Sequence, residues 1–257
     1  MSKYVAVAGK GGAGKTTFTA LMLRQIVKSQ NNISILAVDA DPNANLGEAL
    51  GLPVTATISE ILDEIKNPRS IPAGMTKDIY IEYKLQQSLV ESAEIDLLVM
   101  GGPQGAGCYC YANDLLRKHL EKLGKNYDFI TVDTEAGLEH ISRRTIPYVD
   151  IMFVISDSSV RGIRSAGRVY DLIKGLKSEI KQVYLVVTKT AEESINSLRE
   201  EIMQTGLQLV GDIPLDPLVV KQDLAGMPIF DLPDEALSVQ AVDRIVRQVG
   251  LLKNYNY

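Results

Sequence analysis

Short runs of hydrophobic residues recur along the chain, separated by longer stretches in which hydrophobic positions follow a helical spacing. The runs show no regular alternation with polar residues, which is typical of strands buried on both faces of a parallel sheet. They lie at residues 4–8, 35–38, 95–100, 129–132, 151–155, 183–187 and 207–213. The helical stretches lie at residues 16–28, 113–123, 160–176 and 194–204. This order predicts a doubly wound α/β fold with a mostly parallel sheet, whose ligands bind outside the carboxyl ends of the strands.

The remaining segments are less regular. Near the end of the chain, Asp234 can cap a final helix that continues to Val249 and packs its apolar stripe on the core. Residues 78–83 are compatible with a strand or with one arm of a hairpin, and this choice stays open. Because no repeat, low-complexity tract or long linker interrupts the pattern, we expect one domain over residues 1–257.

The composition narrows the classes of function. With 257 residues, 46% hydrophobic and 23% charged, the chain is long enough for one large core. Its net charge of -5 argues against a strongly basic nucleic-acid surface. No window approaches the about 18 uninterrupted apolar residues of a membrane span, and the first strand starts without a signal peptide. We therefore expect a cytoplasmic protein with neither nucleic acid nor a membrane as its partner.

A phosphate-binding loop joins the first hydrophobic run to the first helical stretch. Its sequence, Gly-Lys-Gly-Gly-Ala-Gly-Lys-Thr-Thr, occupies residues 9–17. The glycines leave backbone N–H groups free for a polyphosphate, Lys15 reaches the outer phosphates, and the Thr16 hydroxyl suits a Mg²⁺ ion. The nucleotide-binding residues predicted from this loop are Gly11, Gly12, Ala13, Gly14, Lys15, Thr16 and Thr17.

Lys10 is an additional cation at the second position of this loop. A loop that binds only its own phosphates has no evident use for a second lysine at this point. The alternative interpretation is a solvated surface lysine.

Carboxylates follow two of the predicted strands. Asp39 and Asp41 come directly after the second hydrophobic run, and Asp133 follows the fourth. One carboxylate can hold Mg²⁺ through its water shell while another orients an attacking water near the γ-phosphate. Gly137, four positions after Asp133, suits a hinge that responds to the γ-phosphate. For Asp41 the alternative is a cap on a helix that begins near residue 44.

Taken together, these motifs resemble the deviant Walker A ATPases of the MinD, ParA and nitrogenase iron protein class. The similarity extends over residues 4–218. It rests on the loop with its additional lysine, on Asp-x-Asp at residues 39–41 and on Asp-Thr-x-Ala-Gly at residues 133–137. It implies an ATP-hydrolysing enzyme with the MinD-like P-loop fold.

The resemblance also implies roles for single residues. Lys10 would reach the ATP of the partner subunit in a homodimer, and Lys15 would act on the phosphates of its own chain. Asp41 would orient the attacking water, so that Lys10, Lys15 and Asp41 form the expected catalytic set. Asp39 and Asp133 would lie near the Mg²⁺ ion.

Base recognition is expected near the ends of the sixth and seventh predicted strands. Thr188 and Lys189 stand where the resembled class usually has an asparagine and a basic residue. A threonine hydroxyl lacks the paired donor and acceptor of an amide, so backbone groups of Pro214, Leu215 and Asp216 are expected to compensate. The expected nucleotide is ATP. Considered without the resemblance, this last segment is a plain proline-punctuated turn.

The chain has two cysteines, which follow the third hydrophobic run in a glycine-rich loop. Cys108 and Cys110 direct two thiols toward one face when the backbone between them is extended. Because Zn²⁺ prefers four ligands and Ni²⁺ commonly takes four in a plane, a twofold dimer would complete such a site. The residues alone leave a pair of buried packing groups or a redox pair as alternatives.

This loop resembles that of the CooC-type nickel-insertion ATPases and of the related AcsF proteins. The shared pattern, Gly-x-Gly-Cys-x-Cys-x-x-x-x-Leu-Leu-Arg, spans residues 105–117, with a second matching segment at residues 137–144. The resemblance implies a homodimer that holds Ni²⁺ between paired Cys108 and Cys110 loops, with Zn²⁺ as a possible substitute. Its client would be carbon monoxide dehydrogenase or acetyl-CoA synthase. A MinD/ParA-like positioning or partition ATPase and an iron–sulfur carrier ATPase stay open as alternatives.

Overall fold

The computed structural model describes residues 2–30, 32–102, 116–118, 120–134, 148–175 and 179–252. These residues form a seven-stranded sheet in the order β3-β2-β4-β1-β5-β6-β7, in which all neighbouring strands are parallel. The strands are β1 (Lys3–Gly9), β2 (Ile35–Ala40), β3 (Asp96–Val99), β4 (Phe129–Thr134), β5 (Tyr148–Asp157), β6 (Glu179–Thr190) and β7 (Gln208–Pro214). The predicted doubly wound α/β fold is confirmed.

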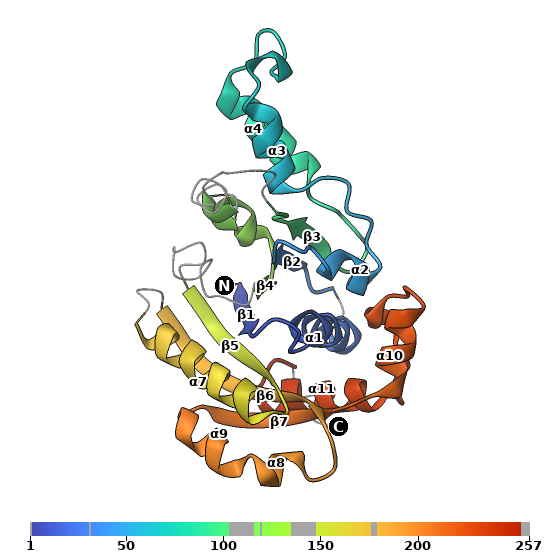
Figure 1. Ribbon diagram of the computed structural model, residues 1–257. Helices are drawn as coiled ribbons and strands as arrows, with labels where there is room; N and C mark the ends of the chain where they lie inside the picture. Colours follow the sequence, from blue (N-terminus) through green and yellow to red (C-terminus); the bar gives the residue numbers. More distant parts are fainter. Residues whose placement is uncertain are drawn as a thin grey trace.

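Helices cover both faces of the sheet (Figure 1). They are α1 (Lys15–Ser29), α2 (Leu46–Leu50), α3 (Ile58–Ile65), α4 (Lys77–Gln87), α7 (Val160–Lys174), α8 (Ser194–Ser197), α9 (Arg199–Thr205), α10 (Pro217–Leu224) and α11 (Leu237–Gln248). Short 3-10 turns lie at η1 (Pro68–Ser70), η2 (Gly124–Asn126) and η3 (Ile229–Asp231). Residues 116–118 and 120–123 are helical as well, in agreement with the helix predicted over 113–123.

The hydrophobic core has two layers, one on each face of the sheet. Successive residues of β1 point to opposite layers: Val5 and Val7 pack beneath α1 and α11, whereas Ala6 and Ala8 pack on the side of α7. This alternation follows from the two-residue period of a strand. Because both faces are covered, every core strand is hydrophobic at consecutive positions, and the sequence therefore shows runs instead of alternation.

The helical hairpin of α3 and α4 projects beyond the β3 edge of the sheet (Figure 1). Residues 78–83 lie inside α4 and form neither a strand nor an arm of a hairpin, so both predicted alternatives are wrong. Thr76 caps this helix by accepting the N–H of Ile79, and Tyr80, Ile81 and Leu85 are its buried residues. Their spacing is helical, but polar residues between them weaken the pattern.

Two other predicted helices differ from the structure. The final helix begins at Leu237 without a side-chain cap, and Asp234 instead pairs with Arg24 and Lys28 of α1 at 2.6 and 2.8 Å. A carboxylate three residues before a helix is available to a nearby buried arginine, and this contact is invisible in the local sequence. The stretch predicted at 194–204 divides into α8 and α9, because Leu198 between them leaves helical geometry and is buried.

Among the residues that the structure describes, no helix combines the length and the apolar character needed to cross a membrane.

The fold places the phosphate loop by a close contact between β1 and β5. Gly9 is paired with Ile155 and has φ of 146°, and a Cβ added to Gly9 would lie 2.2 Å from the carbonyl oxygen of Ile155. Any larger residue would therefore push the start of the loop away from β5. This contact determines the direction in which the chain leaves the sheet toward Lys10.

We expect Gly9→Ala to destabilise the nucleotide-free protein by about 2–4 kcal/mol, because a backbone clash and an unfavourable φ act together. Urea unfolding measures this loss. Gly11→Ala is the matched control in the same loop, since no atom of the described residues lies within 4 Å of a Cβ built there. A change below about 1 kcal/mol is expected for the control, and equal losses for the two variants would contradict the packing argument.

Candidate nucleotide-binding site

The loop between β1 and α1 curls so that the first turn of α1 stays open. Gly12 and Gly14 have φ of 75° and 88°, and the N–H of Ala13 donates to the carbonyl of Lys10 at 3.2 Å. Gly14 stands at the N-cap of α1, and no side chain of the described residues caps this end. The unpaired N–H groups and the positive end of the helix dipole therefore face the loop, an arrangement that favours a bound phosphate.

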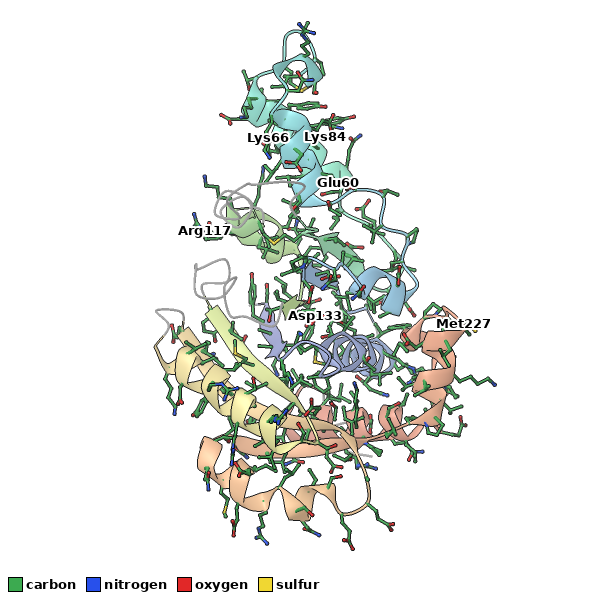
Figure 2. All side chains as sticks on the ribbon, in the orientation of Figure 1. Glu60, Lys66, Lys84, Arg117, Asp133 and Met227 are labelled. Carbon is green, nitrogen blue, oxygen red and sulfur yellow. The ribbon has the colours of Figure 1, made fainter. Side chains whose placement is uncertain are left out.

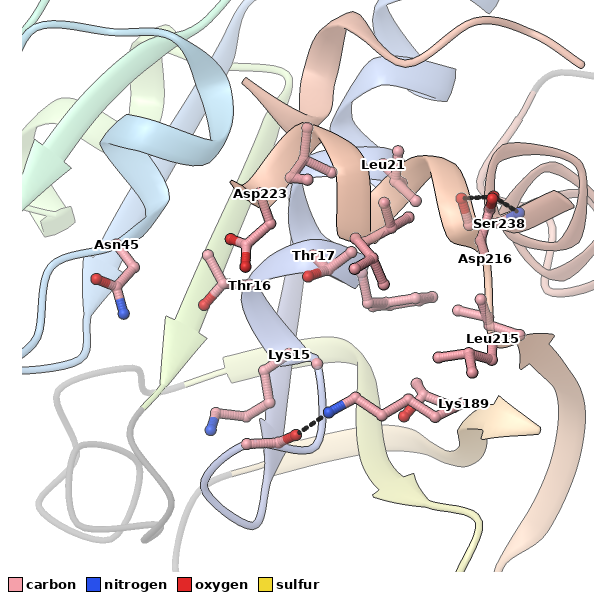
Figure 3. A pocket seen from close by; sticks show the side chains of 18 of the residues that line it. Lys15, Thr16, Thr17, Leu21, Asn45, Lys189, Leu215, Asp216, Asp223 and Ser238 are labelled. Atoms are coloured by element: carbon pink, nitrogen blue, oxygen red, sulfur yellow. Dashed lines mark hydrogen bonds between the residues drawn. The ribbon is translucent and has the colours of Figure 1, made fainter. Parts of the chain in front are cut away.

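Two residues at the end of β6 hold this loop in place. The Thr188 hydroxyl lies 2.6 Å from the carbonyl oxygen of Ala13, and the Lys189 ammonium donates to the carbonyl of Gly12 at 2.8 Å (Figure 3). Thr188 also lies 3.2 Å from the carbonyl oxygen of Ser156. The polar atoms of both predicted base-recognition side chains are thus turned toward carbonyl groups, where they support the loop.

A cavity of about 500 Å³ opens from the loop. Most of the predicted nucleotide-binding residues line it, namely Gly11, Gly12, Gly14, Lys15, Thr16, Thr17, Thr188, Lys189, Pro214, Leu215 and Asp216. Asp41 lines it as well. Ala13 does not, because its side chain is fully buried behind the loop. Lys10 also lies outside this lining, and its side chain is exposed on another side of the loop.

The part of the cavity away from the loop is apolar and was missed by the sequence analysis. Phe18 and Leu21 of α1 face Val219 and Val220 of α10 across it, with Ile229 beyond them. Such a surface suits the flat face of a nucleobase. A local signal for α10 did exist, because Asp216 followed by proline is a favourable start of a helix. That α10 lines the same cavity as α1 has no signal in the sequence, since about 200 residues separate the two helices.

Asp216 connects α10 to α11. Its side chain is buried and accepts hydrogen bonds from the N–H of Leu218 and from both the N–H and the hydroxyl of Ser238 (Figure 3). Burial acts to raise the pKa of Asp216, but these hydrogen bonds outweigh it and hold the pKa below its ordinary value. The carboxylate of Asp216 is therefore engaged within the protein, while Pro214, Leu215 and Asp216 together line this side of the cavity.

Asp39 and Asp133 are register partners at the carboxyl ends of β2 and β4. Asp133 lies near the centre of the molecule (Figure 2). Asp133 accepts the Thr16 hydroxyl at 2.7 Å, while its other oxygen, Oδ1, is buried without a hydrogen-bond partner among the described residues. Burial, together with the nearby charge of Asp39, raises the pKa of Asp133 to about 7, against the lowering effect of the Thr16 hydrogen bond.

Asp39 is fully buried as well. It accepts the N–H groups of Asp41 at 3.0 Å and Leu46 at 2.8 Å, and burial raises its pKa to about 6. The Thr16 hydroxyl and the two carboxylates, one of which has a buried oxygen without a partner among the described residues, form a set of hard oxygen ligands that fits Mg²⁺. Within the described ranges, no three His, Cys, Asp or Glu side chains gather as a metal site. Mg²⁺ bound to a nucleotide needs fewer, because phosphates and waters complete its shell.

Asp41 stands at the edge of the cavity. Its carboxylate accepts both the N–H and the side-chain amide of Asn43 at 2.9 Å. The alternative of a helix cap is wrong for Asp41, because α2 begins at Leu46 and it is Asp39 that accepts the Leu46 N–H. The remaining predicted residues, Cys108, Cys110 and Gly137, lie outside the described residues.

The parallel sheet, the phosphate loop after β1 and the carboxylates after β2 and β4 define a P-loop ATPase of the MinD/ParA type. The family described as AAA domain matches residues 2–185, and the chain belongs to this family.

Relatives of known sequence agree with this class. An uncharacterised ATP-binding protein of Methanocaldococcus jannaschii is 43% identical, over 95% of this chain and 97% of its own. The carbon monoxide dehydrogenase accessory protein CooC of Rhodospirillum rubrum is 30% identical, over 89% of each chain.

Solved structures agree with the fold. A ParA family ATPase from Chlorobium tepidum superposes with a TM-score of 0.72 at 17% identity, covering 97% of this chain and 98% of its own. The cell division protein MinD of Aquifex aeolicus gives a TM-score of 0.70 at 22% identity, with 98% and 99% covered.

The raised pKa of Asp133 predicts how the metal-free, nucleotide-free protein responds to pH. Between the ordinary value of 3.8 and about 7, the folded state keeps a proton that the unfolded chain has released. The free energy of unfolding therefore falls as pH rises through this window. Asp133→Asn removes the charge, so we expect it to stabilise the protein by roughly 2–4 kcal/mol at pH 8 and to have little effect near pH 4.

Urea unfolding in the presence of a chelator, at several pH values, measures this difference. Asp171→Asn is the control, because that carboxylate is exposed. If Asp133→Asn increases the free energy of unfolding by the same amount at pH 4 and at pH 8, the assignment of the raised pKa to Asp133 is contradicted.

Proposed function

We propose that the protein is an ATP-dependent nickel metallochaperone that matures carbon monoxide dehydrogenase or acetyl-CoA synthase. In this proposal, ATP draws two copies of the chain together, and Ni²⁺ is held between their paired Cys108 and Cys110 loops. Hydrolysis then loosens the dimer and releases the metal to the client enzyme. The Cys-x-Cys sequence and the relative named as a carbon monoxide dehydrogenase accessory protein support this function.

The observation that carries the proposal is a direct contact between the nucleotide site and the segment that leads into the cysteine loop. The N–H of Met100 donates to the carbonyl of Asp39 at 2.8 Å, and Asp39 is the register partner of Val99. A Cβ added to Gly102 would lie 3.3 Å from the carbonyl oxygen of Pro42. Residues 100–102 therefore rest on residues 39–42, which contain both carboxylates of the Asp-x-Asp motif.

The other side of this segment is held by α3. Ser59 donates its N–H to the carbonyl of Met100 at 2.9 Å and its hydroxyl to the carbonyl of Gly101 at 3.1 Å. Gly101 has φ of 70°, and a Cβ there would lie 2.6 Å from the Thr57 hydroxyl oxygen. Residues 100–102 are thus held by residues 39–42 on one side and by residues 57–59 on the other. A shift of residues 39–42 on nucleotide binding would therefore displace the start of the cysteine loop as well.

The proposed roles at the nucleotide follow from where the side chains lie. Lys15 lines the cavity at 6% exposure and would bind the outer phosphates. Thr16, Asp39 and Asp133 would hold Mg²⁺, which supplies positive charge to the β- and γ-phosphates when bound. Asp41, at the cavity edge, would orient the water that attacks the γ-phosphorus, giving ADP and phosphate.

The position of Lys10 supports the involvement of a second copy of the chain. It is exposed and absent from the lining of its own cavity, although only five positions separate it from Lys15. A lysine that does not line the nucleotide cavity of its own chain is available to the nucleotide of another, which supports the proposed homodimer.

We expect the double variant Cys108→Ala/Cys110→Ala to lose stoichiometric Ni²⁺ binding, because thiolates are its proposed ligands. Metal content per ATP-bound dimer, measured under reducing and anaerobic conditions, tests this. ATP affinity should change less than about twofold, since the described residues that line the nucleotide cavity come from other segments of the chain. Tyr109→Phe controls for disturbance of the loop. Ni²⁺ binding that survives in the double variant would refute the proposed metal site, and a visible absorption band after anaerobic purification would favour an iron–sulfur cluster.

We expect Lys10→Ala to abolish ATP-dependent dimerisation while the monomer still binds nucleotide, because Lys10 acts on the partner's phosphates. Sedimentation velocity with and without ATP measures the dimer. Lys77→Ala removes an exposed lysine at the start of α4 and should leave dimerisation unchanged. An ATP-bound dimer that persists in Lys10→Ala would exclude the role across the interface.

A further inference from the structure

A second hollow, of about 270 Å³, lies beside Lys10 on the side of α7. Its lining consists of Lys10, Arg161, Arg164, Ser165 and Arg168. The α7 residues are spaced by three and four positions, which places them on one face of the helix. The hollow thus brings four cationic side chains together on a chain whose net charge is -5.

Most of this charge is uncompensated. Arg164 forms a two-point pair with Glu201 of α9, at 3.0 and 2.8 Å. Within the described ranges, no carboxylate lies within ion-pair distance of Lys10, Arg161 or Arg168. Like charges held near one another repel, so the unliganded arrangement is electrostatically unfavourable.

The position of Arg161 adds to this cost. It is the second residue of α7, whose N-cap is Ser159, so a cation occupies the positive end of the helix dipole. Stable helices favour anions at this end and cations at the other. An anion beside Arg161 would interact favourably with the side chain and with the helix terminus at once. The arrangement is therefore suited to a bound anion.

The hollow also lies next to the phosphate loop without opening into its cavity. β5 is the neighbour of β1, so the first turn of α7 follows the strand that contacts Gly9. Of the described residues that line the nucleotide cavity and this hollow, none is shared. A ligand in the hollow would therefore not be the nucleotide bound by the same chain.

We propose that Lys10, Arg161 and Arg168 form an anion site for a phosphoryl group, distinct from the nucleotide cavity of the same chain. A phosphoryl group matches several converging cations better than a carboxylate, because it carries more charge and more acceptor oxygens. Two sources provide this chemistry: a free phosphate or pyrophosphate, and the terminal phosphates of a nucleotide held by a second copy. The second source rests on the proposed ATP-driven dimer.

The first experiment tests the site without dimerisation. Full-length Lys15→Ala protein, in which the nucleotide cavity is disabled, is titrated with pyrophosphate by calorimetry at low ionic strength. We expect binding that weakens about tenfold or more when Arg161→Gln and Arg168→Gln are added, because each removes a charge-assisted contact. Arg164→Gln should weaken it less than about threefold, since Glu201 already balances Arg164. Arg244→Gln, an exposed arginine of α11, is the remote control.

The second experiment keeps Lys15 and measures self-association with ATP by sedimentation. Arg161→Gln/Arg168→Gln should raise the dimer dissociation constant about tenfold, with the ADP affinity of the dilute monomer unchanged. If the arginine substitutions weaken only pyrophosphate binding, the ligand is a free anion. If they weaken only self-association with ATP, the ligand is the nucleotide of the second copy. If the substitutions weaken neither pyrophosphate binding nor self-association, the proposed site is wrong. It is also wrong if the protein binds polyglutamate in place of pyrophosphate. If the unaltered protein fails to associate with ATP, the dimer proposal fails, while the first experiment still decides the anion site.

Discussion

The burial of two neighbouring carboxylates, Asp39 and Asp133, is the constraint around which this site is arranged. The protein interior disfavours their charged forms, and their hydrogen bonds to Leu46, Asp41 and Thr16 offset only part of that cost. A divalent cation beside a polyphosphate would supply the missing positive charge. Binding of such a ligand would therefore offset the cost of burying these two carboxylates.

The segment that carries Asp39 also contacts the residues that precede the cysteine loop. Through main-chain contacts, Asp39 and Pro42 support Met100 and Gly102, which lead toward the two cysteines. Main-chain contacts of this kind transmit small displacements well, because they cannot relax by a change of side-chain rotamer. In the proposed cycle, these contacts would link phosphate binding to a loop more than 60 residues along the chain from Asp39.

Much of the fold was predictable, since strands buried on both faces appear as uninterrupted hydrophobic runs. The phosphate loop, Asp39 and Asp133 were predictable for another reason, because their chemistry is carried by neighbouring residues at fixed spacing. The apolar wall formed by Phe18 and Val219 could not be predicted, since it joins helices from opposite ends of the chain. Polar residues on the exposed side of α4 similarly concealed a helix whose buried face packs against α3.

The sequence by itself determined the order of the strands along the chain and the chemistry of the phosphate loop, because both depend on residues that are close along the chain. Only the tertiary structure decided that Lys15 faces the nucleotide cavity while Lys10 faces the arginines of α7. It also decided that Thr188 and Lys189 bind loop carbonyls, and that Asp234 pairs with Arg24. These outcomes depend on which strands and helices become neighbours. The order of the strands within the sheet is set by the packing of the whole core.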